Sequence, residues 1–427
     1  MFGAVAASNF VVNSSTSITA VAPPGSAGTV GVTVTNSYGT SAVGPTDRFT
    51  YLAPGGSYFP LTPTRLLDTR TNGQTLGANS SLNLDVVGGA VPSDATAVAL
   101  NVTATDTTAN SYLSVYPTGA AQPVVSNLNW VAGETVPNLV VVPVGQNGQV
   151  ALYNYVGSTN VVVDLEGYFA PATTGSAQGS YVPLTPARVT DTRPGSGFPN
   201  AGSTLGPNSS LKIQVAGVGG VPATGAAAAV LNVTVTNTTG ASYLTAYPQG
   251  VSRPLASNLN WVTGETVANR VVVPLSSTGM ITVYNYSGDA NVVVDVNGYF
   301  VAGTTAPSNA GFYEPITPVR ILDTRQTTGP IGAGESLPVQ VSGEYGISGN
   351  AVAIASNVTA TDTTSSSYFT VYPGGTRPLA SDVNWSAGQT VSNCTLATLD
   401  QSGSLEIYNY QGSADAIVDV FGFFIPA

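Results

Sequence analysis

Six of the ten arginines in this chain fall in a recurring RxxDTR string, which places each pair of guanidinium groups beside an aspartate. The residues are Arg65, Asp68 and Arg70; Arg188, Asp191 and Arg193; and Arg320, Asp323 and Arg325. Such a pair could hold a carboxylate or an acidic sugar through bidentate hydrogen bonds. The alternative, which we prefer, is internal ion pairing within the string and with Asp164, Asp295 and Asp419, tying the first strand of each unit to its last.

Carboxylates at comparable spacing also raise the question of catalysis. Asp164, Asp295 and Asp419, taken with Glu134 and Glu265, could form acid–base pairs for glycosidic cleavage. Gln389 replaces the glutamate in the third copy, so a structural or turn-capping role fits better. Histidine is absent, which excludes Ser-His-Asp and Cys-His mechanisms and histidine zinc sites. We predict no enzymatic activity, no cofactor and no metal site, because the sequence also lacks an Asp-rich calcium loop.

Aromatic rows are the second set of candidate binding residues. The pairs Tyr112 and Tyr116, Tyr243 and Tyr247, and Tyr368 and Tyr372 have the spacing of one strand face, and Trp130, Trp261 and Trp385 recur in a shared string. If exposed, these rings could stack on sugars, with Asn127 and Asn129 supplying hydrogen bonds. The competing interpretation is that one row, or the tryptophan, closes the edge of a core. The single cysteine, Cys394, aligns with Leu139 and Arg270, so we expect it to be an incidental thiol.

The candidate residues lie in sequence strings that each occur three times along the chain. LTPTRLLDTR returns as LTPARVTDTR and ITPVRILDTR, SNLNWVAGETV as SNLNWVTGETV and SDVNWSAGQTV, and VVVDLEGYF as VVVDVNGYF and AIVDVFGFF. Three landmarks in one order, three times, predict three modules at residues 58–170, 181–301 and 312–427. Segments rich in Ala, Thr, Gly and Ser follow Phe169 and Phe300 and predict flexible linkers of about ten residues.

Within a module the hydrophobic period is two, the period of a β-strand. Val98, Leu100, Val102 and Ala104 alternate with Ala99, Asn101, Thr103 and Thr105, which predicts one buried and one polar face. Asn101, Asn232 and Asn357, each heading an N-V-T string, fall on the predicted polar face. The predicted class is all-β, with tandem β-sandwich or jelly-roll-like modules.

Residues 1–52 lack these landmarks and alternate over about four expected strands. Phe2, Gly3, Ser17, Ile18, Ala20, Pro23, Gly28, Val30, Gly39, Thr40 and Phe49 to Tyr51 resemble the second half of an IPT/TIG domain. The resemblance implies a partial immunoglobulin-like fold whose opening strands are absent, leaving unpaired edges and an uncovered apolar face. We expect truncation, with strand donation by a neighbouring chain as the alternative. The three modules resemble DTR-containing repeats of secreted or surface proteins of actinobacteria.

Composition bears on location and partners. The formal net charge of −11 argues against nucleic-acid binding, and no apolar run reaches the length of a membrane span. We expect an extracellular or cell-surface protein. Because the start lacks the pattern of a signal peptide, we also expect its true start to lie upstream. The predicted function is a non-catalytic structural or adhesive array, with surface glycans or neighbouring copies as partners. The alternatives are a carbohydrate- or cell-wall-binding appendage of a secreted hydrolase, and a subunit of an extracellular filament.

Overall fold

The computed structural model describes residues 1–23, 28–44, 47–51 and 55–426. The chain divides into two compact units, Met1–Pro54 and Gly55–Ala427. The predicted all-β class is confirmed, with 53% of residues in strands. The helical turns among the described residues are α1 (Thr69–Asn72), η1 (Gln146–Gly148) and η2 (Thr324–Gln326). None of the helices in these ranges is long and apolar enough to cross a membrane.

The N-terminal unit consists of short antiparallel pairs. They are β1 (Asn9–Ser14) with β2 (Ser17–Val21), β3 (Gly28–Gly31) with β6 (Arg48–Tyr51), and β4 (Thr35–Asn36) with β5 (Gly39–Thr40). Every residue of β1 and β2 is exposed, including Phe10 and Val12. The hairpin of β1 and β2 therefore exposes apolar side chains. Residues 24–27, 45–46 and 52 of the predicted immunoglobulin-like segment lie outside the described residues.

Each of the three repeats contributes eight strands. The first has β7 (Gly56–Asp68), β8 (Ser80–Asp85), β9 (Ala97–Thr105), β10 (Ser111–Pro117), β11 (Leu128–Trp130), β12 (Val136–Pro143), β13 (Gln149–Asn154) and β14 (Asn160–Pro171). The second has β15 (Tyr181–Asp191), β16 (Ser209–Gln214), β17 (Ala226–Thr236), β18 (Ser242–Pro248), β19 (Leu259–Trp261), β20 (Val267–Pro274), β21 (Met280–Asn285) and β22 (Asn291–Val301). The third has β23 (Gly311–Asp323), β24 (Ser336–Gln340), β25 (Ala353–Thr361), β26 (Ser367–Tyr372), β27 (Val383–Trp385), β28 (Val391–Thr398), β29 (Ser404–Asn409) and β30 (Asp415–Pro426).

The strand order is the same in all three repeats. In the first, an inner sheet runs β12-β9-β14-β7 and an outer sheet runs β11-β10-β13-β8, with antiparallel pairing throughout. Eight strands in two four-stranded sheets, with most connections crossing between them, form a jelly-roll sandwich. The apolar side chains between the two sheets make a separate core in each repeat. Turn residues and alternating strands therefore build the predicted two-layered module.

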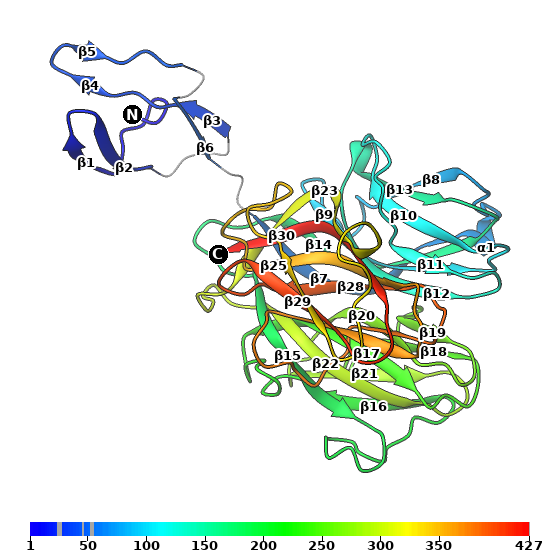
Figure 1. The fold of residues 1–427 in the computed structure, drawn as a ribbon. Coiled ribbons are helices and arrows are strands. Elements are labelled where there is room, and N and C mark those ends of the chain that lie inside the picture. Colours follow the sequence, from blue (N-terminus) through cyan, green and yellow to red (C-terminus); the bar gives the residue numbers. More distant parts are fainter. Residues whose placement is uncertain (24–27, 45–46, 52–54, 427) are drawn as a thin grey trace. The chain divides into compact units, whose positions relative to one another are not determined.

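The three inner sheets meet at the centre of the second unit. Their first strands touch where Tyr181 pairs with Gly311 and Tyr313 pairs with Gly56, so the inner sheets join into one 12-stranded sheet. A further core lies between them and takes equivalent side chains from each repeat. These are Tyr58, Tyr181 and Tyr313; Phe169, Phe300 and Phe424; and the alanines, valines and leucines of the neighbouring inner strands. In Figure 1 the inner strands β7, β14, β20, β25 and β28 lie together in the middle of this unit.

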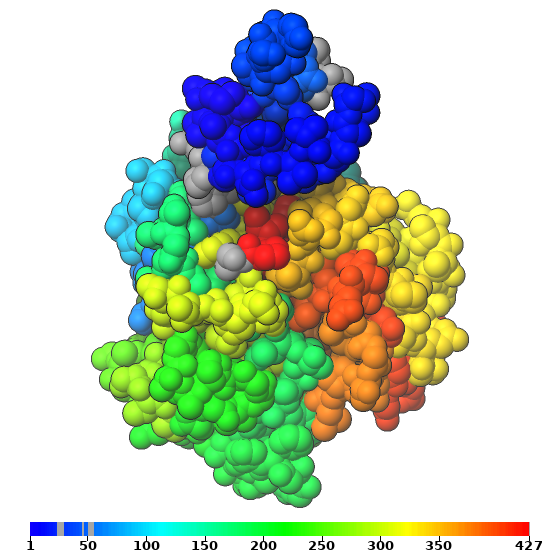
Figure 2. All heavy atoms as spheres, turned by 90° about the vertical axis from the view of Figure 1, so that its left-hand side faces the viewer, coloured from blue at the N-terminus to red at the C-terminus, as the bar shows by residue number. Residues whose placement is uncertain are grey.

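This shared core corrects the expectation of a polar face in each repeat. Ala99, Asn101, Thr103 and Thr105 were expected to form a solvent-facing polar surface, but β9 is buried along its whole length. The reason is that the second face of each inner sheet packs against the other repeats instead of water. In the space-filling view the second and third repeats lie directly against each other (Figure 2).

The segments between repeats are ordered connections, which corrects the expectation of flexible linkers. The Ser57 hydroxyl donates to the Gln178 carbonyl at 2.7 Å, and the Tyr58 amide donates to the Gly179 carbonyl at 2.8 Å. The Ala177 amide donates to the Thr304 carbonyl at 3.0 Å, which joins the two connections to each other. The repeats therefore form one body, not separate modules on a string.

Packing at the centre explains the GYF and GFF landmarks. The Tyr181 hydroxyl donates to the Asn297 carbonyl at 3.0 Å and lies against Gly298. A Cβ at Gly298 would come within 2.4 Å of that hydroxyl, so any larger residue would displace the ring. The same arrangement joins Tyr58 to Gly167 and Tyr313 to Gly422. Glycine is required here to let a central tyrosine approach the last strand.

Candidate functional site

The RxxDTR arginines lie along the boundary between repeats and are paired with aspartates. Arg65 binds Asp164 through Nε and Nη2 and reaches Asp68 at 3.3 Å, which joins β7 to β14. Arg188 pairs with Asp295 at 2.9 Å and Asp191 at 3.3 Å, and Arg320 pairs with Asp419 at 2.8 Å and Asp323 at 3.7 Å. These contacts are internal to each repeat.

The second arginine of each string folds back on the aspartate between the two arginines. Arg70, Arg193 and Arg325 reach Asp68, Asp191 and Asp323 at 2.6, 2.6 and 2.7 Å. Asp68 also caps α1 by accepting from the Arg70 amide at 3.2 Å. Hydrogen bonding from Arg70 lowers the pKa of Asp68, so this carboxyl is ionised at neutral pH. Each arginine is therefore engaged by an aspartate of its own repeat, and the second arginine of each string keeps a partly exposed side chain.

The next repeat inserts its SNLNW or SDVNW string against these ion pairs. Asn101 Nδ2 donates to the Ser257 carbonyl at 2.6 Å, and the Ser257 amide donates to the Asp164 carboxylate. Asn232 and Asp295 hold Ser381 in the same way, and Asn357 and Asp419 hold Ser126. The N-V-T asparagines are therefore buried contacts between repeats, which corrects their expected place on a polar surface.

A cleft opens on the surface beside this contact. Between the second and third repeats it has a volume of about 340 Å³ and is lined by Arg188, Arg193, Thr234, Tyr368, Asn384 and Tyr410, among others. Between the third and first repeats it has a volume of about 250 Å³ and is lined by Arg320, Arg325, Thr359, Tyr112 and Asn129, among others. At the first–second boundary the equivalent residues are Arg65, Arg70, Thr103, Tyr243, Asn260 and Tyr286. Each cleft combines arginines of one repeat with tyrosines of the next.

The structure separates the candidate sugar-binding aromatic residues into two groups. Tyr112, Tyr243 and Tyr368 are half-buried at the repeat boundaries and stack on exposed partners Tyr155, Tyr286 and Tyr410, with ring centroids 5.0 to 5.1 Å apart. Tyr116, Tyr247, Tyr372, Trp130, Trp261 and Trp385 are buried and do not face solvent, which corrects their assignment as glycan contacts. Their physical role is packing: for example, Trp130 lies in the repeat core and its Nε1 donates to the Ala109 carbonyl at 3.1 Å.

The glutamates considered for catalysis cap turns. Glu134 Oε2 accepts from the Val131 amide at 3.0 Å, and Glu265 Oε2 accepts from the Val262 amide at 3.0 Å. Gln389 Oε1 accepts from the Ser386 amide at 2.8 Å. An amide oxygen serves this role as well as a carboxylate oxygen, which explains why glutamine can stand in the third copy.

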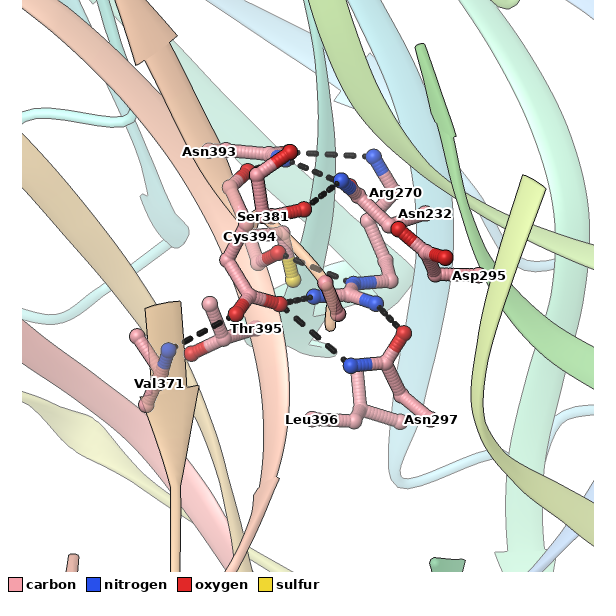
Figure 3. A network of polar contacts seen from close by, with 12 residues as sticks. Asn232, Arg270, Asp295, Asn297, Val371, Ser381, Asn393, Cys394, Thr395 and Leu396 are labelled. Carbon is pink, nitrogen blue, oxygen red and sulfur yellow. Dashed lines mark hydrogen bonds and ion pairs between the residues drawn. The ribbon is translucent and has the colours of Figure 1, made fainter. Parts of the chain in front are cut away.

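A buried polar network at the centre distinguishes the second–third boundary from the other two (Figure 3). Arg270 is fully buried and donates to Asp382 at 2.6 Å, to the Cys394 carbonyl at 3.2 Å and to Asn297. Burial raises the pKa of the Cys394 thiol to about 12, so this cysteine is held as a neutral thiol. Arg270 is therefore a buried cation whose charge is matched by an aspartate from the next repeat.

The equivalent positions carry different residues at the other boundaries. At the first–second boundary Glu166 accepts from Asn258 Nδ2 at 2.7 Å and from the Val272 amide at 3.1 Å. At the third–first boundary the residue equivalent to Glu166 is Phe421, and Asn127 Nδ2 is buried without a hydrogen-bond partner among the described residues. The three boundaries between repeats therefore differ in their buried polar and charged residues.

Glu166 makes the stability of this body depend on pH. Burial raises the pKa of Glu166 to about 8, from an ordinary value of 4.5. Between these two values the folded chain binds a proton that the unfolded chain has lost, so stability falls as pH rises. We expect Glu166→Gln to remove this pH dependence. The unfolding free energy of the variant should therefore rise relative to that of the parent protein by on the order of 1.4 kcal/mol for each pH unit between about pH 5 and pH 8. Urea unfolding at several pH values measures the difference.

Glu344→Gln is the matched control, because Glu344 is exposed. Its unfolding free energy should follow that of the parent protein across the same pH range. Parallel curves for Glu166→Gln and the parent would contradict the account.

Several of the residues that join the repeats were not singled out from the sequence. Asn138, Asn269 and Asn393 join the three repeats in a closed ring, because the Oδ1 of each accepts a backbone amide of another repeat. Asn269 accepts from the Leu139 amide at 3.1 Å, Asn393 from the Arg270 amide at 3.0 Å, and Asn138 from the Cys394 amide at 2.9 Å. The available signal was an asparagine recurring at one position inside three apolar strands. Glu166, as an acidic residue between apolar neighbours, was a second signal.

Comparisons with known proteins identify no family for this chain. No protein-family model and no curated protein matches the chain. Among solved structures, an atomic structure of Sulfolobus turreted icosahedral virus matches with 9% identity, 94% coverage of this chain, 91% of that chain and a TM-score of 0.18. A structure described as a triple jelly-roll fold and turret assembly in an archaeal virus matches with 8% identity, 94% and 90% coverage and a TM-score of 0.18. Similarity at that TM-score supports no argument about this chain.

Proposed function

We propose that this chain is a non-catalytic extracellular or cell-surface protein with an adhesive role, in which one rigid body presents binding clefts at the boundaries between its repeats. The observation that carries the proposal is the recurrence of the same side chains at successive repeat boundaries. Linked weak sites on one body bind a repetitive surface much more tightly than one site alone, because the second contact is intramolecular. A body with a shared core holds these sites at fixed separations.

The engagement of the carboxylates supports a non-catalytic role. Asp164, Asp295 and Asp419 are each held by an arginine and by a backbone amide of the next repeat. A general acid or base must be free to exchange a proton with a substrate, and these groups are committed to holding the repeats together. The resemblance of residues 1–52 to IPT/TIG domains and of the repeats to surface proteins supports an extracellular location.

Co-sedimentation of the full chain with purified bacterial cell envelopes tests this function. We expect the chain to enter the pellet at sub-stoichiometric loading and to resist washing, because several clefts engage the surface together. The polymers of the envelope should show no change in length after long incubation. A chain that stays in the supernatant at every concentration, or that shortens the polymers, would contradict the proposal.

A second candidate function is a subunit of a filament joined by strand addition. The observation that favours it is the hairpin of β1 and β2, in which Phe10, Val11 and Val12 are 56 to 63% exposed. Within the described residues each of these strands pairs only with the other, so both outer edges can accept a strand. Sedimentation velocity of the full chain should then show concentration-dependent growth that Val11→Pro abolishes, whereas a single species at all concentrations would exclude this candidate.

A further inference from the structure

We propose that each boundary cleft binds a neutral sugar unit, held between the stacked tyrosines of one repeat and the arginine–aspartate cluster of the preceding repeat. This inference rests on the proposed adhesive function and names its ligand class. The cleft between the second and third repeats shows the arrangement most completely. It contains an aromatic platform, hydrogen-bond donors and an acceptor within one cavity of about 340 Å³. That volume lies near the lower end of the range for small-molecule sites, about 300–1,000 Å³.

The platform is a pair of parallel tyrosine rings. Tyr368 and Tyr410 stack with centroids 5.0 Å apart and planes inclined by 11°. Tyr410 is 52% exposed, so the pair presents aromatic surface to solvent at the rim of the cleft. The apolar face of a pyranose ring packs well on such a surface, and Leu379, 62% exposed, adds an apolar wall beside it.

The opposite wall offers hydrogen-bond donors without net charge. Arg188 and Arg193 are balanced by Asp191 and Asp295, so the formal charge of the cluster is zero. The described hydrogen bonds of Arg193 use Nε and Nη2 and leave Nη1 without one, on a side chain that is 45% exposed. A balanced cluster with an open N–H suits sugar hydroxyls better than an acidic ligand, and the net charge of −11 also opposes polyanions.

An unpartnered hydroxyl is the second, independent sign of a ligand. Thr234 lines this cleft, is 6% exposed, and its hydroxyl has no hydrogen-bond partner among the described residues. Thr359 in the third–first cleft and Thr103 at the first–second boundary have the same property. Buried hydroxyls are normally paired, so the same unpaired group at three boundaries leaves a hydrogen bond that a water or a ligand in the cleft would complete. The recurrence makes a local packing accident a poor explanation.

The test uses the full chain on an array that carries neutral oligosaccharides of hexoses and N-acetylhexosamines beside uronic-acid and sialic-acid glycans. We expect binding to a subset of the neutral glycans and little to the acidic ones. Titration with the best neutral oligosaccharide should give at least two sites per chain, one for each of the two described clefts. Preference for acidic glycans, or no glycan binding at all, would overturn the inference.

The variant that connects binding to the clefts removes the exposed tyrosine of each stacked pair: Tyr155→Ala, Tyr286→Ala and Tyr410→Ala together. We expect each site to weaken roughly tenfold, the upper end of what one aromatic contact contributes. Tyr345→Ala is the matched control, since Tyr345 is 51% exposed on the same body but lies outside the clefts. Thermal unfolding should be nearly unchanged in both proteins, because all four rings are on the surface.

The outcomes separate this inference from the proposed function. If the triple variant binds the glycans as the parent does but loses envelope binding, the clefts are adhesive without being sugar sites, so the inference fails while the proposed function stands. If it binds both as the parent does, the clefts are not the binding sites and both fail. If the parent protein binds no envelope, the proposed function fails with it. If the control Tyr345→Ala loses binding equally, the clefts are again not the site.

Discussion

Replacing Arg270 by leucine is expected to lower the free energy of unfolding by about 3–5 kcal/mol. Arg270 and its partner Asp382 are 0% and 1% exposed, so removing the guanidinium leaves a buried carboxylate without its counter-charge. Asn297 would also lose the donor to its Oδ1. Urea unfolding of the full chain, followed by tyrosine and tryptophan fluorescence, measures the loss.

The first–second boundary suggests a second substitution that should restore the lost stability. Leucine and asparagine occupy the positions of Arg270 and Asp382 at the first–second boundary, as Leu139 and Asn258. Arg270→Leu combined with Asp382→Asn should therefore recover most of the lost stability, because the introduced side-chain amide could donate to Asn297 as Asn258 does to Glu166. If the double variant is as unstable as Arg270→Leu alone, the cost does not arise from the unpaired charge.

Replacing Phe300 by alanine is expected to cost about 3–5 kcal/mol and to loosen all three repeats, not only the second. Phe300 is fully buried in the shared core, with its ring centroid 4.2 Å from that of Tyr58 in the first repeat and 5.3 Å from that of Tyr181. Tyr181 in turn lies 4.7 Å from Phe424 of the third repeat. Hydrogen exchange should therefore accelerate in β9 and β25 as well as in β17.

Phe198→Ala is the control within the same repeat. Phe198 is half-buried in a loop and its ring meets only the Arg188 guanidinium, at 5.8 Å, among the described aromatic and cation contacts. Its removal should cost about 1 kcal/mol or less and leave exchange in the other repeats unchanged. Acceleration confined to the second repeat in Phe300→Ala would indicate that the repeats are energetically separate.

The strand period and the recurring landmarks were sufficient to predict a jelly-roll-like sandwich for each repeat. These signals are local in the sequence: apolar and polar residues alternate, as from Val98 to Thr105, and turn residues lie between the strands. The charged strings were also informative, because arginines are scarce in this chain and charged groups at recurring positions need partners. The paired contacts of Arg65 with Asp68 and Asp164 follow from that reasoning.

The association of the repeats could not be derived from the same pattern. Asn101 and Thr103 alternate with apolar residues, as they would on a face exposed to water, yet they are buried because the partners of Asn101 come from another repeat. Periodicity reports which residues share a face but not what covers that face. The Ala- and Gly-rich connections also have the composition of flexible linkers, although their backbone groups bond to neighbouring repeats. Only the near-continuous apolar strands VVVP and VVVD indicated burial on both faces.

The boundary clefts illustrate the same point at the level of the candidate site. The tyrosines and arginines were both recognised as candidates, but Arg193 and Tyr410 lie on different repeats and meet only because the repeats close around one axis. Tyr372 and Trp385, which share those strands or strings, instead face the interior.

Hydrogen exchange of the full chain at increasing sub-denaturing urea concentrations tests most directly whether the three jelly-roll sandwiches share one core. The slowest amides of the equivalent strands β9, β17 and β25 should converge on one opening free energy with one urea dependence, as expected for a single cooperative body. Three separate limits, with one repeat opening while the others stay protected, would contradict it.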